Sequence, residues 1–204
     1  MKVDNELCKE YNQSSIKDHA KSKSMWMGSF EQSMSNQCVY DRVKDIFEKK
    51  NIKYSPALIN TFYEVLANSV DQYLKMKSHN KRSFKVTCID ILFDKDNGVS
   101  IKNNGQGIPI SVVLDSDGQK VYIPELISTR FLAGSNNSEN KNRKSAGTNG
   151  LGLTLVNNLS DYFELTTTDL VTKKIYTQIS ENGMDTINKP IIQKYTKDHR
   201  GTTI

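Results

Sequence analysis

The chain has 204 residues, 36% of them hydrophobic and 25% charged, which suits a single domain, or one domain with an arm. No apolar run approaches the length of a membrane span, and the first residues lack the apolar stretch of a secretory signal. Three widely spaced cysteines argue against a disulfide framework or a zinc site, and the net charge of +5 permits a polyanionic partner without establishing one.

Residues 1 to about 50 are polar with weak periodicity, and we interpret them as an arm that ends in a short helix. The apolar cluster Met25-Trp26-Met27-Gly28 gives the arm one adhesive point. From Val39 to Lys50, the apolar residues fall on one side of a helix. The expected organisation is an arm with a short helix over residues 1–50, followed by a domain over residues 51–204.

A long helix is predicted to begin after Ser55, which can cap it, with Pro56 in its first turn. Apolar residues recur on one face at helical spacing from Leu58 to Tyr73. Another face holds a polar stripe, made of Glu64, Asn68 and Asp71. Such a stripe is usually only the solvated side of a helix, so by itself it predicts no site.

Strands are predicted from Phe84 to Phe93 and from Val99 to Lys102, joined by the turn Asp96-Asn97-Gly98. The second strand runs directly into Asn103-Asn104-Gly105-Gln106-Gly107, where glycines free the backbone as it leaves the sheet. A β-hairpin is expected from Val112 to Val121.

A helix from Pro124 to Leu132, with Gly134 as its stop, precedes an unpatterned polar loop over residues 135–146. A further helix is expected from Leu151 to Leu159, and strands at residues 163–168, 174–180 and from 202 onward. This order predicts an α+β fold, a two-layer sandwich in which helices cover one face of a mixed sheet. Because the last residues fall within a predicted strand, we expect the sequence to be part of a longer protein.

Three groups of residues have the chemistry of a nucleotide-hydrolysing site. Glu64 could orient a water molecule or accept its proton, and the side-chain oxygen of Asn68 could bind Mg²⁺. The amide of Asn103, in Asn103-x-Gly105-x-Gly107, could donate to and accept from a purine edge, although a tight turn alone would explain this motif.

Gly147-x-x-Gly150-x-Gly152 opens a predicted helix, whose free N–H groups would form an anion site. A flexible hinge before a helix start is the alternative for the isolated motif. The glycine order is the reverse of the Rossmann fingerprint, and Leu153 occupies the position of the P-loop lysine, so neither of those sites is predicted.

Taken in order, these motifs resemble the boxes of the GHKL ATPase family, which includes gyrase, Hsp90, histidine kinases and MutL; Gly201-Thr202-Thr203 resembles the last box. The resemblance implies the Bergerat fold of that family. Finer features are similar to the type IIA topoisomerase branch of eukaryotes and large DNA viruses, namely residues 62–71, Asn103 in place of the aspartate of bacterial gyrases, and Tyr122-Ile123-Pro124-Glu125.

The resemblance implies a role for each matching position. Glu64 corresponds to the general base, Asn68 to the Mg²⁺ ligand, and Asn103, with Gly105 and Gly107, to the adenine contact. The loop at residues 135–146 corresponds to the ATP lid. The remaining nucleotide-binding positions are Ser135 and Asn136 for ribose and phosphate, and Gly147, Thr148, Asn149, Gly150, Leu151 and Gly152 for the triphosphate.

The function implied by the resemblance is that of the N-gate ATPase region of a type II DNA topoisomerase. Its cofactors would be ATP and Mg²⁺, and ATP would close a homodimer around double-stranded DNA in the full-length enzyme, with no membrane partner. The location would be intracellular, in the nucleus or cytoplasm, including host cytoplasm for a virus. The arm near Trp26 resembles the strap that reaches the partner subunit.

Three positions depart from the family pattern: Thr148 replaces an arginine, Thr154 a lysine and Trp26 a tyrosine. The first two remove positive charge near the phosphates, which predicts weaker nucleotide affinity. The γ-phosphate-sensing lysine of the family belongs to a later domain, so this chain alone is expected to turn ATP over slowly. Two alternatives stay open, another GHKL ATPase of the MutL or Hsp90 type, and a degenerate nucleotide-gated dimerisation module without turnover.

Overall fold

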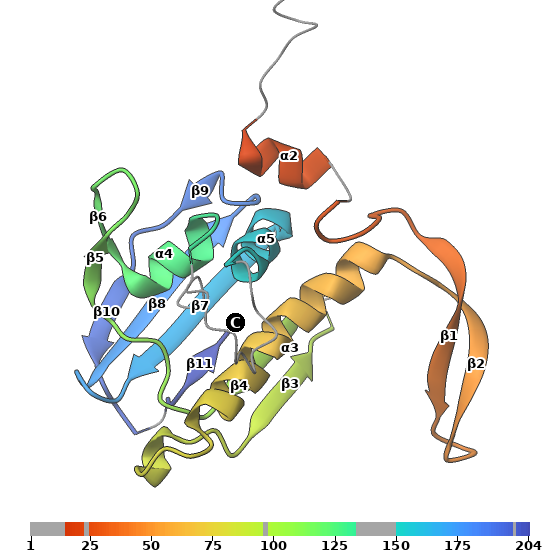
Figure 1. Ribbon diagram of the computed structural model, residues 1–204, viewed down its shortest axis with the longest axis horizontal. Helices are drawn as coiled ribbons and strands as arrows, with labels where there is room; N and C mark the ends of the chain where they lie inside the picture. The colour runs from red at the N-terminus through yellow and green to blue at the C-terminus, as the bar shows by residue number, and fades with distance from the viewer. Residues whose placement is uncertain (1–14, 23–24, 96–97, 134–149, 198) are drawn as a thin grey trace, which may run out of the picture.

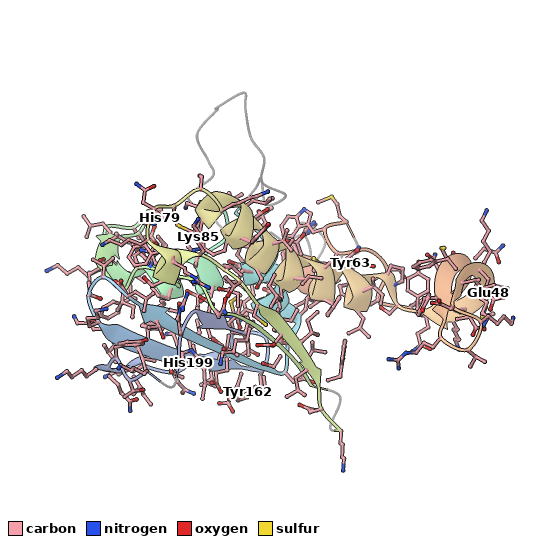
Figure 2. The ribbon with its side chains drawn as sticks, turned by 90° about the horizontal axis from the view of Figure 1, so that it is seen from below. Glu48, Tyr63, His79, Lys85, Tyr162 and His199 are labelled. Carbon is pink, nitrogen blue, oxygen red and sulfur yellow. The ribbon has the colours of Figure 1, made fainter. Side chains whose placement is uncertain are left out.

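The protein is described from a computed structural model, which covers residues 15–22, 25–95, 98–133, 150–197 and 199–204. Helices α3 (Pro56–Met76), α4 (Ile123–Thr129) and α5 (Gly152–Leu159) lie on one face of the main sheet, as Figures 1 and 2 show from two sides. The predicted two-layer sandwich is therefore confirmed.

The main sheet has seven strands, in the order β10-β8-β7-β11-β4-β3, with β9 paired to β8. Among the described residues, the strand pairings of the main sheet are all antiparallel, so the prediction of a mixed sheet is corrected. Short turns that reverse the chain join β3 to β4 and β7 to β8, and β11 lies antiparallel to both of its neighbours, β4 and β7. The strands are β3 (Ile89–Phe93), β4 (Val99–Asn103), β7 (Tyr162–Asp169), β8 (Lys174–Glu181), β9 (Thr186–Ile187), β10 (Ile191–Lys194) and β11 (Thr202–Thr203).

The register of the central strands brings three polar residues into one row. Thr202 of β11 pairs with Asn103 of β4 on one side and with Thr167 of β7 on the other. Asn103 is the last residue of its strand, so the following glycine loop leaves the sheet beside this row.

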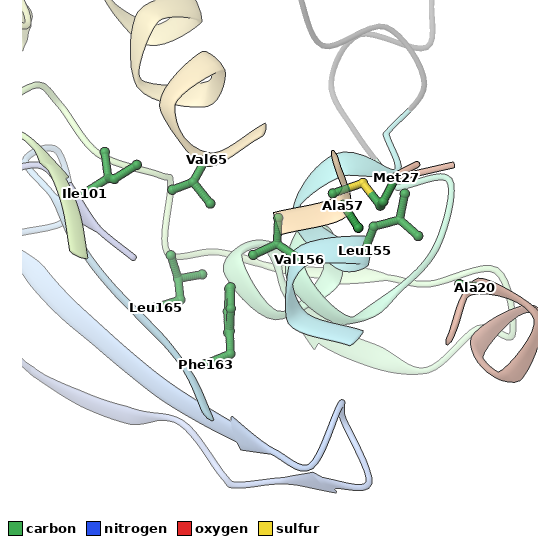
Figure 3. Close-up of a cluster of buried hydrophobic side chains, with 9 residues drawn as sticks. All are labelled: Ala20, Met27, Ala57, Val65, Ile101, Leu155, Val156, Phe163 and Leu165. Carbon is green, nitrogen blue, oxygen red and sulfur yellow. The ribbon is translucent and has the colours of Figure 1, made fainter. Parts of the chain in front are cut away.

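The predicted long helix is confirmed as α3, and Ser55 caps it by accepting a hydrogen bond at Oγ from the N–H of Leu58. Val65 points from α3 into the core between the helices and the sheet (Figure 3). The buried residues of this core are Ala20, Met27, Ala57, Val65, Ile101, Leu155, Val156, Phe163 and Leu165.

Residues 15–22 and 25–28 of the arm pack against its own domain. Helix α2 (Ile16–Ser22), which the sequence did not predict, lies near the end of α5, where Lys17 Nζ is 2.6 Å from an oxygen of Asp185. The side chain of Asn158 donates to the carbonyl of Lys17. Met27 is 3% exposed and belongs to the core, so the adhesive point of the arm is bound within the same chain.

The helix predicted from Val39 to Lys50 is wrong. This stretch belongs to a β-hairpin of β1 (Ser33–Asp41) and β2 (Ile46–Tyr54), which projects from the body beside α3 (Figure 1). Its turn forms because the Asp41 carboxylate accepts the N–H groups of Val43 and Lys44.

Other boundaries differ by a few residues. The strand predicted from Phe84 begins only at Ile89. Phe84 is instead the last residue of the 3₁₀ turn η1 (Arg82–Phe84), and residues 85–88 belong to no helix or strand. The predicted hairpin after the glycine loop is confirmed as β5 (Val112–Leu114) and β6 (Lys120–Tyr122). Its turn is held by Asp115, whose Oδ1 accepts from the N–H of Asp117 and of Gln119.

Candidate functional site

Two sets of contacts define the site. The first joins α3 to α5. Glu64 is half-buried in the middle of α3, and Gly152 is the first residue of α5. A Cβ atom built on Gly152 would overlap Oε2 of Glu64, so any larger residue at position 152 would displace this carboxylate. The start of α5 and the predicted base are therefore in direct contact.

The environment of Glu64 raises the pKa of its carboxyl group, chiefly through burial and secondly through the charge of Asp71. Asp71 lies two turns further along the same polar stripe of α3. A carboxylate whose pKa is moved toward neutral pH is better matched to accepting a proton from water.

Asn68 lies one turn after Glu64 on α3 and is exposed. The i, i+4 spacing directs both side chains from the same side of the helix. Among the described residues, no group of three or more histidine, cysteine or acidic side chains could hold a metal ion. A Mg²⁺ ion at Asn68 would therefore need water and phosphate oxygens for the rest of its coordination, which is how Mg²⁺ commonly binds with nucleotides.

The second set of contacts fixes Asn103, which is 5% exposed. Its Nδ2 lies 3.4 Å from Oγ of Ser69 on α3, and its Oδ1 accepts from the N–H of Gly105 at 3.2 Å. Gly201 has φ +92° and lies so close that a Cβ there would overlap the carbonyl oxygen of Asn103. Asn103 is thus held by α3, by its own loop and by the turn that precedes β11.

The glycine loop after Asn103 is held against β7. Gly107 has φ +81°, and a Cβ there would overlap the carbonyl oxygen of Thr168. The hydroxyl of Thr167 accepts from the N–H of Ile108 at 2.8 Å and lies 2.8 Å from the hydroxyl of Thr202. Gly105 is also confined, because a Cβ there would lie 2.7 Å from Cγ2 of Val86.

Two residues near this loop, Thr167 and Asn104, have no role that was predicted from the sequence. Thr167 is fully buried and joins the loop to β11, but nothing in the threonine-rich sequence of β7 singles it out. Asn104 does not face the same partners as Asn103, because its Oδ1 accepts from the N–H groups of Thr87 and Cys88. Asn104 therefore holds the chain segment before β3 against the loop.

The first turn of α5 has no side-chain cap, and Leu151 at the cap position contributes none. Gly150 has φ +61°, so the chain turns sharply before the helix. The first N–H groups of a helix lack intrahelical partners and form a natural anion site. Gly150, Leu151 and Gly152 therefore lie where an anion would be received, beside Glu64.

Five predicted binding positions and the whole of the predicted lid lie outside the described residues. These are Ser135, Asn136, Gly147, Thr148 and Asn149, together with the loop at residues 135–146.

Comparison with known proteins identifies the family of this site. Residues 55–204 match the family of histidine kinase-, DNA gyrase B- and HSP90-like ATPases. The chain belongs to this ATPase family. The matched range begins at the Ser55 cap of α3 and includes every predicted site residue.

Within the ATPase family, the chain is homologous to DNA topoisomerase 2. It is 38% identical over 194 residues to that of African swine fever virus (isolate Pig/Kenya/KEN-50/1950), covering 88% of this chain and 15% of the relative. It is 34% identical over 179 residues to the Pisum sativum protein, covering 88% and 12%, and 32% identical over 173 residues to the Saccharomyces cerevisiae protein, covering 84% and 11%.

Solved structures agree with the sequence comparison. The ATPase region of Saccharomyces cerevisiae topoisomerase II is 30% identical, with a TM-score of 0.84 over 96% of this chain and 49% of that chain. The ATPase and transducer domains of Balamuthia mandrillaris topoisomerase II are 26% identical, with a TM-score of 0.84 over 99% of this chain and 49% of that chain. This chain thus spans about half of the solved chains and a much smaller share of the curated relatives.

Two structural details bear on expectations from the sequence, namely the burial of Thr154 and the search for membrane-spanning helices among the described residues. Thr154 is fully buried, and its hydroxyl lies within hydrogen-bond distance of two carbonyl oxygens of the α4 segment. The Thr154 hydroxyl is therefore hydrogen-bonded within the fold. Among the described helices, none combines the length and apolar character that crossing a bilayer requires.

Proposed function

We propose that this chain binds ATP with Mg²⁺ and hydrolyses it as the ATPase region of a type II DNA topoisomerase. The observation that carries the proposal is the contact between the Glu64 carboxylate and Gly152 at the uncapped start of α5. A base and an anion site adjoin there, and hydrolysis of a phosphoanhydride requires both.

In this proposal, Glu64 orients a water molecule and accepts its proton as the water attacks the γ-phosphate. Support comes from the raised pKa of Glu64, caused first by burial and then by Asp71. The first N–H groups of α5, from Gly152 onward, would stabilise the triphosphate charge. Asn103 would receive the adenine edge, because its amide sits at the end of β4 with α3 on one side and the glycine loop on the other.

Asn68 is the proposed Mg²⁺ ligand, and its exposed position one turn from Glu64 supports this role. When bound, the ion would neutralise phosphate charge. Glu64, half-buried beside Gly152, would exclude bulk water from one side of the phosphates.

The wider function is proposed from the topoisomerase relatives. In the whole protein, nucleotide binding would close two such regions into a dimer and capture double-stranded DNA, and hydrolysis would reopen them. We further propose an intracellular location, in the nucleus or cytoplasm, and an arm over residues 1–50 that precedes the ATPase domain at residues 51–204.

One observation favours a second candidate, a module that binds nucleotide without turning it over. Thr154 brings no positive charge to the first turn of α5, where a lysine would have supplied one. Both candidates predict nucleotide binding, and they differ only in whether Glu64 performs chemistry.

The test is ATP-dependent relaxation of supercoiled DNA by the full-length protein that carries this chain. Glu64→Ala should abolish relaxation while binding of a non-hydrolysable ATP analogue persists. Glu31→Ala, which removes an exposed carboxylate from the segment before β1, is a suitable control and should relax DNA normally. Unchanged relaxation by Glu64→Ala would reject Glu64 as the base.

A further inference from the structure

The end of α4 presents carbonyl groups that its own helix does not satisfy, as every helix end does. Two polar side chains of α5 approach them. The hydroxyl of Thr154 lies 3.2 Å from the carbonyl oxygen of Ile127 and 3.1 Å from that of Arg130. Because a hydroxyl carries one proton, it is shared between these two acceptors.

Asn157 repeats the contact one turn later on α5. Its Nδ2 donates to the carbonyl of Ser128 at 2.8 Å and lies 3.3 Å from the hydroxyl of Ser180 on β8. Thr154 and Asn157 are both fully buried. Each lost hydrogen bond would leave a main-chain carbonyl of the α4 segment without this donor.

The two contacts are placed where they control the nucleotide site. Thr154 lies two residues after Gly152, in the same first turn of α5 whose N–H groups form the anion site. Gly152 in turn abuts the Glu64 carboxylate, which a Cβ atom at position 152 would displace. A small shift of this turn relative to α4 would therefore change the distance between the anion site and the base.

We propose that Thr154 is a positioning residue for the nucleotide site, whose hydroxyl holds the first turn of α5 to the end of α4. In this role it keeps the phosphate-binding N–H groups in register with Glu64. The inference rests on the proposed function, since it concerns how that site is held. It also gives this threonine a role different from that of the lysine in the family pattern, because it acts through α4 and not on the phosphates.

The alternative is that the Thr154 hydroxyl only stabilises the fold, as any buried hydrogen bond does. The two roles differ in what they predict for nucleotide binding at temperatures well below melting. A purely stabilising contact leaves the affinity of the folded protein unchanged, whereas a positioning contact changes it.

The test compares two substitutions in the 204-residue chain. Thr154→Val keeps the shape and removes the hydroxyl, and Thr154→Ser keeps the hydroxyl. The Kd of a non-hydrolysable ATP analogue is measured by calorimetry, and the melting temperature is measured without nucleotide. Thr154→Val should raise Kd about three- to tenfold, the range expected for one buried hydrogen bond, while Thr154→Ser stays within about twofold of the wild type.

Thr177→Val is the matched control, because it removes the hydroxyl pair between Thr166 and Thr177 on β7 and β8, away from α4 and α5. It should lower the melting temperature and leave Kd unchanged. If Thr154→Val does not fold, Thr154→Cys, with a weaker donor, should give a smaller rise in Kd.

The possible outcomes distinguish failure of the positioning role of Thr154 from failure of the proposed function. Wild-type affinity in a folded Thr154→Val or Thr154→Cys variant, with only its melting temperature lowered, would overturn the positioning role and leave the proposed function intact. Absence of analogue binding by the wild type would instead overturn the proposed function, and the inference with it.

Discussion

The carboxylate of Glu64 lies against the backbone of Gly152, although the two residues are 88 positions apart in the chain. The contact joins the middle of α3 to the first residue of α5. A Cβ atom at position 152 would overlap the end of the Glu64 side chain, so any larger residue there would displace the carboxylate. The proposed base and the proposed anion site are thus parts of one packing arrangement.

A first prediction concerns this glycine. Gly152→Ala forces either Glu64 or the start of α5 to move, and we expect the Kd of a non-hydrolysable ATP analogue to rise about fivefold, since displacing the end of this side chain costs about 1 kcal/mol, the lower end of the range for overpacking. Gly118→Asn is the control, because Gly118 has open space around it and Asn tolerates its positive φ. Equal affinity for Gly152→Ala and the control would show that the contact does not shape the site.

A second prediction concerns pH. The charge of Asp71 contributes to the raised pKa of Glu64, so Asp71→Asn should lower that pKa, although burial will keep it above its ordinary value. A general base works only when deprotonated, and activity falls as the pH drops through its pKa. The acid limb of kcat/KM against pH for ATP hydrolysis should therefore move to lower pH.

The control for this profile is Asp117→Asn, in the β5–β6 turn, which removes an exposed carboxylate far from Glu64 in the fold. Its acid limb should coincide with that of the wild type. An acid limb that is the same in Asp71→Asn would mean that another group controls the proton transfer.

A third prediction concerns the β1–β2 hairpin, whose strands pair with each other and extend away from the sheet (Figure 1). Met34 and Phe47 are exposed on it, and Glu48 lies at the far end from the body in Figure 2. Replacing residues 35–52 by Asn-Gly should leave the melting temperature within about 3 °C, which corresponds to about 1 kcal/mol in a domain of this size.

The same shortened variant should bind the ATP analogue as the wild type does. A larger loss of stability, or a loss of nucleotide binding, would show that the hairpin is part of the ATPase body. The matching variant that keeps the hairpin but replaces Met34 and Phe47 with serine would then tell whether those exposed side chains are responsible.

Several elements could be predicted because their signals are local. The Ser55 cap, the Pro56 first turn and the 3.6-residue periodicity lie within one segment, and α3 begins where they indicate. The glycine motifs were likewise readable, since each combines a strand end or a helix start with backbone freedom. Their assembly into one ATPase site came from their order along the chain.

The helix prediction for part of the β1–β2 hairpin was wrong for a physical reason. Neither of its faces is covered by a core, so its strands lack the alternation of apolar and polar residues that marks a half-buried strand. Val39, Val43, Ile46 and Phe47 instead recur at helix-like spacing by coincidence. The turn signal at Asp41, whose carboxylate accepts two backbone N–H groups, was the available evidence for a hairpin.

Other features depend on contacts between distant segments, which no local pattern encodes. Thr167 supports the glycine loop only because β7 lies beside β11, and Gly201 supports Asn103 only because β11 lies beside β4. The sequence shows Thr154 only as a replacement for the lysine of the family pattern, because its contacts with the α4 segment exist only in the folded chain. Antiparallel pairing likewise follows from which strands become neighbours.

The most direct measurement of the central claim is calorimetric titration of a non-hydrolysable ATP analogue into the wild type, Glu64→Gln and Asn103→Ala. We predict one site per chain, a Kd for Glu64→Gln within about twofold of the wild type, and a loss of at least about tenfold for Asn103→Ala, which removes the amide proposed to contact the adenine. Melting curves would confirm that each variant is folded. Wild-type affinity in a folded Asn103→Ala variant would contradict the account.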